Sequence, residues 1–179
     1  IYVSTIFVVD TAGVVKQKID YSKIKEGQQL IPFMPSDKSQ MVFIGNDLYI
    51  PQTVNLRLGD KAIEKSPIKV VLDTIENTVE ALPMRFPPLI NYKGFGTVGA
   101  FGAEYSCCYD GNRFIYSFNA DEDLYLTNSA HGQIEEKKAK SKYLDNVTVF
   151  RFAEEDFQRM VKAQCEHASY GKIVYDKYR

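Results

Sequence analysis

The feature that most constrains this chain is an internal repeat. An apolar strand, a turn and a second, more polar strand recur at residues 7–18, 70–81 and 124–135. Gly or Asn follows each first strand by about five residues, where a hairpin requires a positive φ angle. The units are roughly 60 residues apart, and self-similarity at a regular period is typical of propellers and other repeat architectures.

A second signature also occurs twice. Residues 104–108 and 170–174 have the pattern of strands, and each is followed at a turn by the sequence Tyr-Asp-x-x-Arg. The first copy continues into an aromatic strand at residues 114–118, whereas the second copy ends the chain at Arg179. Because a strand without a partner leaves backbone groups unpaired, we expect the chain to be a fragment of a larger domain.

The composition favours sheet over helix. The chain has 12 Tyr and 11 Phe, and aromatic residues are enriched in strands. One unit is predicted to hold four antiparallel strands whose polarity rises outward, as in a propeller blade, at residues 103–110, 113–118, 123–128 and 133–139. An earlier unit follows the same plan at residues 41–45, 47–53, 68–73 and 79–82. The predicted fold is therefore all-β, a β-propeller of four-stranded antiparallel blades, of which the chain holds about three.

The predicted organisation is a single propeller domain. Its parts are the end of one blade at residues 1–21, whole blades at 33–83 and 103–142, and the start of the next blade at 169–179. Residues 150–168 are predicted to form one short helix in an inter-blade insertion, because apolar residues recur there at helical spacing. Residues 83–102 are rich in Pro and Gly and are predicted to be an inter-blade loop.

The charge pattern argues against some partners. The formal net charge is −1, which does not fit the basic face of a nucleic-acid-binding protein. Four lysines at positions 137, 138, 140 and 142 follow two glutamates and are predicted to form a solvated edge strand. No apolar run in the chain is long enough for a transmembrane segment.

The cysteines and histidines do not predict a metal site. Cys107 and Cys108 are adjacent and are expected to be buried or half-buried thiols on a strand. Zinc needs four ligands at set spacings, which the three cysteines and two histidines do not supply. His131 and His167 are expected at the surface. We therefore predict no metal and no cofactor.

Two further motifs resemble nucleotide-binding and calcium-binding sequences, but neither kind of binding is expected there. Residues 94–99 match G-x-G-x-x-G, but the motif signals dinucleotide binding only between a strand and a helix, so a flexible loop is expected. Residues 121–123 read Asp-Glu-Asp, without the Gly and distal Glu of a calcium loop, and a solvated turn is expected. No catalytic constellation is recognised.

Repeated polar pairs give the candidate ligand face. One interpretation is a turn in which Asp caps its own loop and pairs with Arg. The other is that such side chains line the ligand face of the ring. The candidates are Asp110, Arg113, Asp121, Asp123, Asp176 and Arg179.

Residues 169–179, 114–118 and 138–143 carry a family resemblance. They are similar to an uncharacterised family of six-bladed, TolB-like β-propeller lipoproteins of Gram-negative gut bacteria, well over about residues 85–179 and loosely before them. The resemblance implies an exported protein, periplasmic or at the cell surface, with a lipid on a cysteine upstream of this chain. It implies no catalytic residues.

Three functional interpretations remain open. The first is an exported binding or scaffold propeller for an unknown protein, peptide or glycan ligand, completed by the remaining blades of the same ring. The alternative is a propeller hydrolase or lyase acting on extracellular polymers, which needs convergent acids or a metal at the ring centre. A third, weaker interpretation is a complete small α+β protein whose last strand pairs in an oligomer.

Overall fold

The part of this chain that the structure describes consists mainly of β-strands. The computed structural model describes residues 5–20, 38–52, 65–87, 105–118 and 121–139, together with Lys142, Ile173 and Asp176. Its strands form three antiparallel sheets, so the all-β prediction is confirmed. The helix expected at residues 150–168 and the glycine motif at residues 94–99 lie outside the described residues.

The first sheet is a hairpin of β1 (Thr5–Val9) and β2 (Val15–Asp20). The carboxylate of Asp10 accepts hydrogen bonds from the backbone N–H groups of Ala12 and Val14, both at 2.9 Å. Gly13 completes the turn with a φ angle of 80°, which glycine adopts without a steric penalty. The repeat pattern predicted this hairpin within residues 7–18.

The middle sheet is a meander in which each strand pairs with the next along the chain. Its order is β3 (Val42–Ile44), β4 (Asp47–Pro51), β5 (Lys69–Asp73) and β6 (Thr78–Ala81). The strands β3, β4 and β5 fall inside their predicted ranges, and β6 begins one residue before its predicted range of 79–82.

The third sheet has the same plan. It consists of β7 (Tyr105–Tyr109), β8 (Phe114–Phe118), β9 (Asp123–Thr127) and β10 (Ile134–Lys138), paired in chain order. All five side chains of the edge strand β10 are exposed. The solvated edge predicted around Lys137 and Lys138 is therefore confirmed for these two residues.

Each of the hairpins β1–β2, β5–β6 and β9–β10 has one turn residue with a positive φ angle. In the β5–β6 turn, Asp73 accepts hydrogen bonds from the backbone of Ile75 and Glu76, and Asn77 takes a positive φ. In the β9–β10 turn the positive φ falls on His131, at 55°, although the sequence pointed to the following glycine. A histidine in this region is uncommon and needs support from its surroundings.

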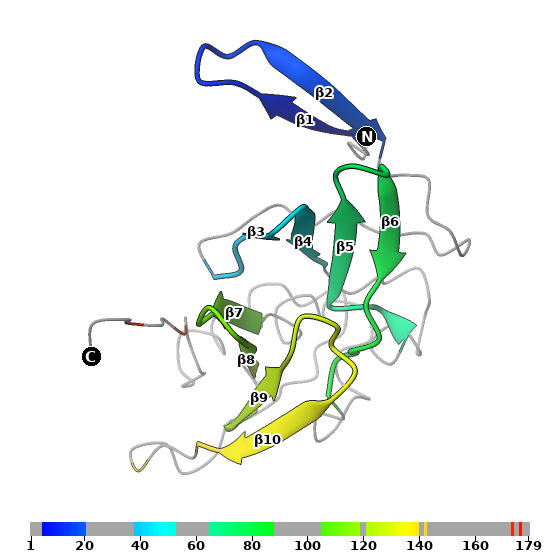
Figure 1. Cartoon of the computed structure of the whole chain (residues 1–179). Coiled ribbons are helices and arrows are strands. Elements are labelled where there is room, and N and C mark those ends of the chain that lie inside the picture. The colour runs from blue at the N-terminus through cyan, green and yellow to red at the C-terminus, as the bar shows by residue number, and fades with distance from the viewer. Residues whose placement is uncertain are drawn as a thin grey trace, which may run out of the picture.

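The middle sheet buries both of its faces. Figure 1 shows the three sheets in chain order, from the blue hairpin through the cyan and green sheet to the one that runs from light green to yellow. Because strand side chains alternate, neighbouring residues of β4 and β5 point to opposite faces. One face packs against the hairpin in a core of Ile6, Val8, Ile19, Leu48, Ile50, Val70, Leu72 and Val79.

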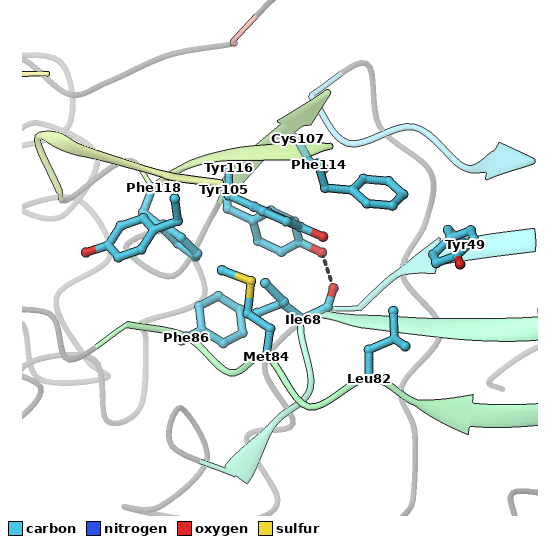
Figure 2. Close-up of a cluster of buried hydrophobic side chains, with 11 residues drawn as sticks. Tyr49, Ile68, Leu82, Met84, Phe86, Tyr105, Cys107, Phe114, Tyr116 and Phe118 are labelled. Atoms are coloured by element: carbon cyan, nitrogen blue, oxygen red, sulfur yellow. Dashed lines mark hydrogen bonds between the residues drawn. The ribbon is translucent and has the colours of Figure 1, made fainter. Parts of the chain in front are cut away.

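The other face meets the third sheet in an aromatic core. Figure 2 shows aromatic side chains of the third sheet in one row, with Ile68, Met84 and Phe86 across from them. Ring pairs such as Phe86–Phe118 and Tyr105–Phe118 lie with centroids 5.8 Å apart. Aromatic pairs at this distance each add about 0.5–1.5 kcal/mol beyond the area that they bury.

One tyrosine hydroxyl joins the two sheets. Tyr105 begins β7, and its Oη lies 2.6 Å from the carbonyl oxygen of Ile68 and 3.0 Å from that of Gln52. The same oxygen accepts a hydrogen bond from the Gln52 N–H at 3.1 Å. Figure 2 marks the bond to Ile68. These buried bonds fix where β7 sits against the end of β4 and the start of β5.

Replacing Tyr105 with Phe should therefore destabilise the chain while leaving its shape unchanged. We expect the Tyr105→Phe variant to lose about 1–2 kcal/mol of unfolding free energy, because water cannot replace these bonds in a closed interface. Chemical denaturation followed by circular dichroism measures the loss.

Tyr109→Phe is the matched control on the same strand. Its hydroxyl donates to the carbonyl of Gly111 at 3.0 Å in an exposed turn, where water can take over, so the change should stay within about 0.5 kcal/mol. Equal losses in the two variants would contradict the role given to Tyr105.

Candidate functional site

A lysine is buried between the middle and third sheets. Lys69 is the first residue of β5, and its side chain is 0% exposed. Its Nζ lies 4.6 Å from the ring centroid of Phe114, 5.6 Å from that of Tyr116, and 3.6 Å from Cys107 Sγ. Lysine is almost never fully buried without a charged partner, so this is the most unusual position in the described chain.

The strand pattern explains why Lys69 points inward. Val70 and Leu72 of β5 belong to the core beneath the hairpin, so the alternating residues Lys69 and Val71 face the third sheet. Burial lowers the pKa of the Lys69 amine, an effect opposed by Cys107. The environment therefore favours the neutral amine, which keeps a lone pair.

Cys107 and Tyr116 are held neutral beside it. Burial raises the pKa of the Cys107 thiol, which Lys69 opposes. Burial also raises the pKa of Tyr116 well above its ordinary value, and the neighbouring Cys107 adds to the effect. The Tyr116 hydroxyl hydrogen-bonds with the Cys107 side chain. The expected burial of Cys107 and half-burial of Cys108 are confirmed.

His131 completes the network, and its expected surface position is wrong. The residue is 1% exposed. Its Nδ1 lies 2.8 Å from the carbonyl oxygen of Ser129, and its Nε2 lies 2.6 Å from the hydroxyl of Tyr116. A carbonyl only accepts, so Nδ1 carries the hydrogen and the neutral ring accepts from Tyr116 at Nε2. Burial lowers the pKa of His131 to about 4.

We call Lys69, Cys107, Tyr116 and His131 the Lys69 network. It joins β5, β7, β8 and the β9–β10 turn in a chain of contacts. It places an amine against a thiol in an interior that excludes water. The sequence carried one signal of it, a lysine inside the apolar run at residues 68–72, which strand prediction alone passes over.

The first pair of ligand-face candidates lies at the β7–β8 turn. Asp110 Oδ1 accepts hydrogen bonds from the backbone N–H groups of Asn112 and Arg113, at 2.8 and 2.6 Å. The guanidinium of Arg113 lies 3.8 Å from Asp110 Oδ2 and 3.5 Å from Glu135 Oε2. This is the geometry of the self-capping turn, one of the two interpretations of the pair.

The second pair lies at the β8–β9 turn. Asp121 accepts hydrogen bonds from the Asp123 N–H at 3.0 Å and from the Tyr125 hydroxyl at 2.6 Å. Asp123 is 6% exposed and pairs with Lys138 through Oδ2 at 2.5 Å, whereas its buried Oδ1 has no hydrogen-bond partner. The solvated turn expected at Asp123 is therefore wrong, because this residue is buried and paired with Lys138 of β10.

The two pairs are not brought together. They flank opposite ends of β8 (Phe114–Phe118), since one turn precedes this strand and the other follows it. Asp176 is exposed, and Arg179 lies outside the described residues. Within the described ranges, no group of three His, Cys, Asp or Glu side chains could hold a metal ion. In the same part of the chain, no helix has the length and apolar character needed to cross a membrane.

The fold and its interior define a class of protein, a stack of antiparallel meander sheets with a polar network between two of them. The chain belongs to the family described as domain of unknown function (DUF4221), whose model matches residues 2–179. The family has no assigned activity in that description, which agrees with the expected resemblance to an uncharacterised family.

A solved structure has the same fold. The crystal structure of a DUF4221 family member from Bacteroides vulgatus ATCC 8482 matches with a TM-score of 0.80 at 18% sequence identity. The match covers 99% of this chain and 49% of that chain, so this chain spans about half the length of its relative. At this identity the likeness shows the fold alone. No curated protein matches the sequence.

The buried histidine should make stability depend on pH. The pKa of His131 is about 4 in the folded chain and about 6.5 when unfolded. Between these values the unfolded chain holds a proton that the folded chain lacks, so the stability falls as the pH drops from 6.5 towards 4, by up to about 3 kcal/mol. Denaturation of the His131→Asn variant at several pH values should lack this component.

Asn is the suitable replacement because Asn77 takes a positive φ in the β5–β6 turn. Carboxylates titrate over the same pH range, but they contribute equally to both proteins, so the difference between the two profiles isolates His131. Parallel pH profiles for wild type and His131→Asn would contradict the buried neutral ring.

Proposed function

We propose that the chain is a contiguous part of a β-propeller that binds a ligand at one end of its stacked sheets. The architectural part of this proposal rests on the hydrogen bonds of one hydroxyl group. Ser106 Oγ in β7 donates to the carbonyl oxygen of Lys38 at 2.9 Å and accepts from the Ile173 N–H at 2.9 Å. It therefore joins the segment before β3, the strand β7, and a residue near the end of the chain.

These three segments occupy equivalent places in successive units. Ser39 forms a parallel bridge with Cys107, whereas strands within each sheet are antiparallel. The first strands of neighbouring propeller blades run side by side in the same direction around the central axis. Ile173 corresponds to Cys107 in the Tyr-Asp-x-x-Arg repeat, so its contact with Ser106 supports a further blade at residues 169–179.

The proposed division follows the repeat. Residues 1–21 end one blade, residues 33–83 and 103–142 form whole blades, and residues 150–168 form a helical insertion. The remaining blades belong to the rest of the protein, since a relative with the same fold has a chain about twice as long. Phe7 and Val9 on the outer face of the hairpin are 54% and 53% exposed, which suits a face that another sheet covers.

The proposed role is binding or scaffolding, with a protein, peptide or glycan as ligand. The Lys69 network is closed to any such molecule, so recognition falls to the turns at the ends of the sheets. Among the described residues, each end holds one buried polar atom without a hydrogen-bond partner, Asp123 Oδ1 and Arg113 Nε. The β8–β9 end is favoured because the guanidinium of Arg113 already has two carboxylates at 3.8 and 3.5 Å, whereas Asp123 Oδ1 is a buried acceptor that a ligand donor could satisfy. No observation among the described residues favours polymer cleavage.

A binding screen with variants at both ends tests this proposal. The full-length protein should bind a member of a broad glycan and peptide array. The Asp121→Asn variant, which can still accept the bond from the Asp123 N–H, should weaken that binding by about tenfold, equivalent to about 1.4 kcal/mol. Titration calorimetry with the selected ligand measures the change.

Arg113→Ala at the opposite end is the control and should bind as the wild type does. A protein that binds nothing on the array, or one weakened by Arg113→Ala and not by Asp121→Asn, would contradict the proposal. A structure of the full-length protein in which the sheets do not close into a ring would overturn its architectural part.

The proposal extends to location. The family resemblance implies export and a lipid on a cysteine upstream of this chain, and on that basis we propose a location in the periplasm or at the cell surface. Fractionation of cells making the full-length protein should find it in the membrane fraction. Recovery of the protein in the soluble cytoplasmic fraction would overturn this assignment.

A further inference from the structure

The contact between Lys69 and Cys107 is unusual in chemistry as well as in burial. The two residues come from β5 and β7, and their side chains are 0% and 7% exposed. Cys107 Sγ, 3.6 Å from Nζ, is the one hydrogen-bond acceptor of the amine among the described residues. An amine and a thiol, both nucleophiles, therefore face each other where water is excluded.

We propose that Lys69 and Cys107 are an oxidative cross-linking site, at which one oxygen atom derived from dioxygen bridges Nζ and Sγ. The site needs no cavity for a ligand, because Nζ and Sγ are already in contact. Only one oxygen atom has to be inserted between them. The inference holds whether or not the sheets belong to a propeller.

The reaction balances with dioxygen as the only co-reactant. One molecule of dioxygen consumes the thiol and the amine and yields the Nζ–O–Sγ bridge and one water. The S–H bond and one N–H bond break, and an N–O and an S–O bond form. Sulfur and nitrogen are each oxidised by two electrons, both oxygen atoms are reduced, and the two hydrogens leave in the water.

The surroundings favour this product over others. Burial disfavours the protonated amine and so makes available the lone pair that forms the N–O bond. Dioxygen is small and apolar enough to enter a packed interior. A disulfide between neighbours is disfavoured because Cys107 and Cys108 point to opposite faces of β7. The aromatic rings of Phe114 and Tyr116 hold Nζ beside the sulfur.

The cross-link would act as a covalent clasp between two sheets. It joins residues 38 positions apart in the sequence and so restricts the unfolded chain as a disulfide does. By the same entropy argument, it should raise the melting temperature by about 10 °C. The stability of the sheet interface would then report the oxidation state of the compartment.

Mass spectrometry of the full chain tests the proposal. The protein is divided into a portion kept anaerobic with a thiol reductant and a portion exposed to dioxygen, and both are unfolded without reductant. The exposed portion should gain one oxygen and lose two hydrogens. A tryptic digest should then contain one joined peptide with Lys69 and Cys107, uncut after Lys69, and Cys108 should remain open to alkylation.

Three variants provide the comparison. Lys69→Met and Cys107→Ala should lose both the mass change and the rise in melting temperature, whereas Cys108→Ala should keep both. Methionine suits the first position because its unbranched apolar chain fills irregular core space. If either buried variant fails to fold, the mass and peptide map of the wild-type chain still decide.

Several results would overturn the proposal. They are an unchanged mass after prolonged exposure to dioxygen, oxygen carried by Cys107 alone with Lys69 still cleaved by trypsin, and loss of two hydrogens without added oxygen. The last result would mean a disulfide or a direct S–N bond, and not an oxygen bridge.

Discussion

The burial of both faces of the middle sheet is the constraint on which the rest of the structure depends. Strands β4 and β5 carry apolar side chains on each face, so the sheet requires a neighbour on both sides. The hairpin covers one face and the third sheet covers the other. Each sheet is thus stabilised by the next one in the stack, and the order of the sheets in space follows their order in the chain.

The interface with the third sheet is not uniformly apolar, and its polar groups give it a defined geometry. An apolar interface alone tolerates sliding of one sheet over another, whereas each hydrogen bond from Tyr105 is satisfied in one position only. A fully satisfied polar network rigidifies a core, and a partly satisfied one is costly. The hydrogen bonding of the Lys69 amine is only partly satisfied, because its acceptor is the Cys107 thiol and a thiol is a weak acceptor.

The sequence was informative about strands because its turns carry their own chemistry. Asp10, Asp73 and Asp110 each accept backbone hydrogen bonds within their own turn, and Asp10 and Asp73 lie at equivalent places of the repeated units. The edge strand β10 could also be predicted, since a run of two glutamates followed by lysines is too strongly charged for the interior of a sheet.

The interior chemistry could not be predicted in the same way. Alternation shows that Lys69 and Val70 face opposite sides, but it does not show that both sides are covered. His131 was placed at the surface because turn residues usually are, yet its ring reaches back to Tyr116 and that bond supports its positive φ. Such contacts depend on sheet packing, which no local pattern contains.

Within the part of the chain that the structure describes, each end of the third sheet holds one buried polar atom without a hydrogen-bond partner, Arg113 Nε at the β7–β8 turn and Asp123 Oδ1 at the β8–β9 turn. At the β7–β8 turn, Asp110 accepts a hydrogen bond from the Arg113 N–H, and the guanidinium of Arg113 has carboxylates of Asp110 and Glu135 at 3.8 and 3.5 Å. At the β8–β9 turn, Asp123 is paired with Lys138 through one oxygen and keeps the other buried without a donor. A buried polar atom without a partner costs about 1–3 kcal/mol, and strain of this kind is common at functional sites. The β8–β9 end is therefore where an added hydrogen-bond donor would gain most.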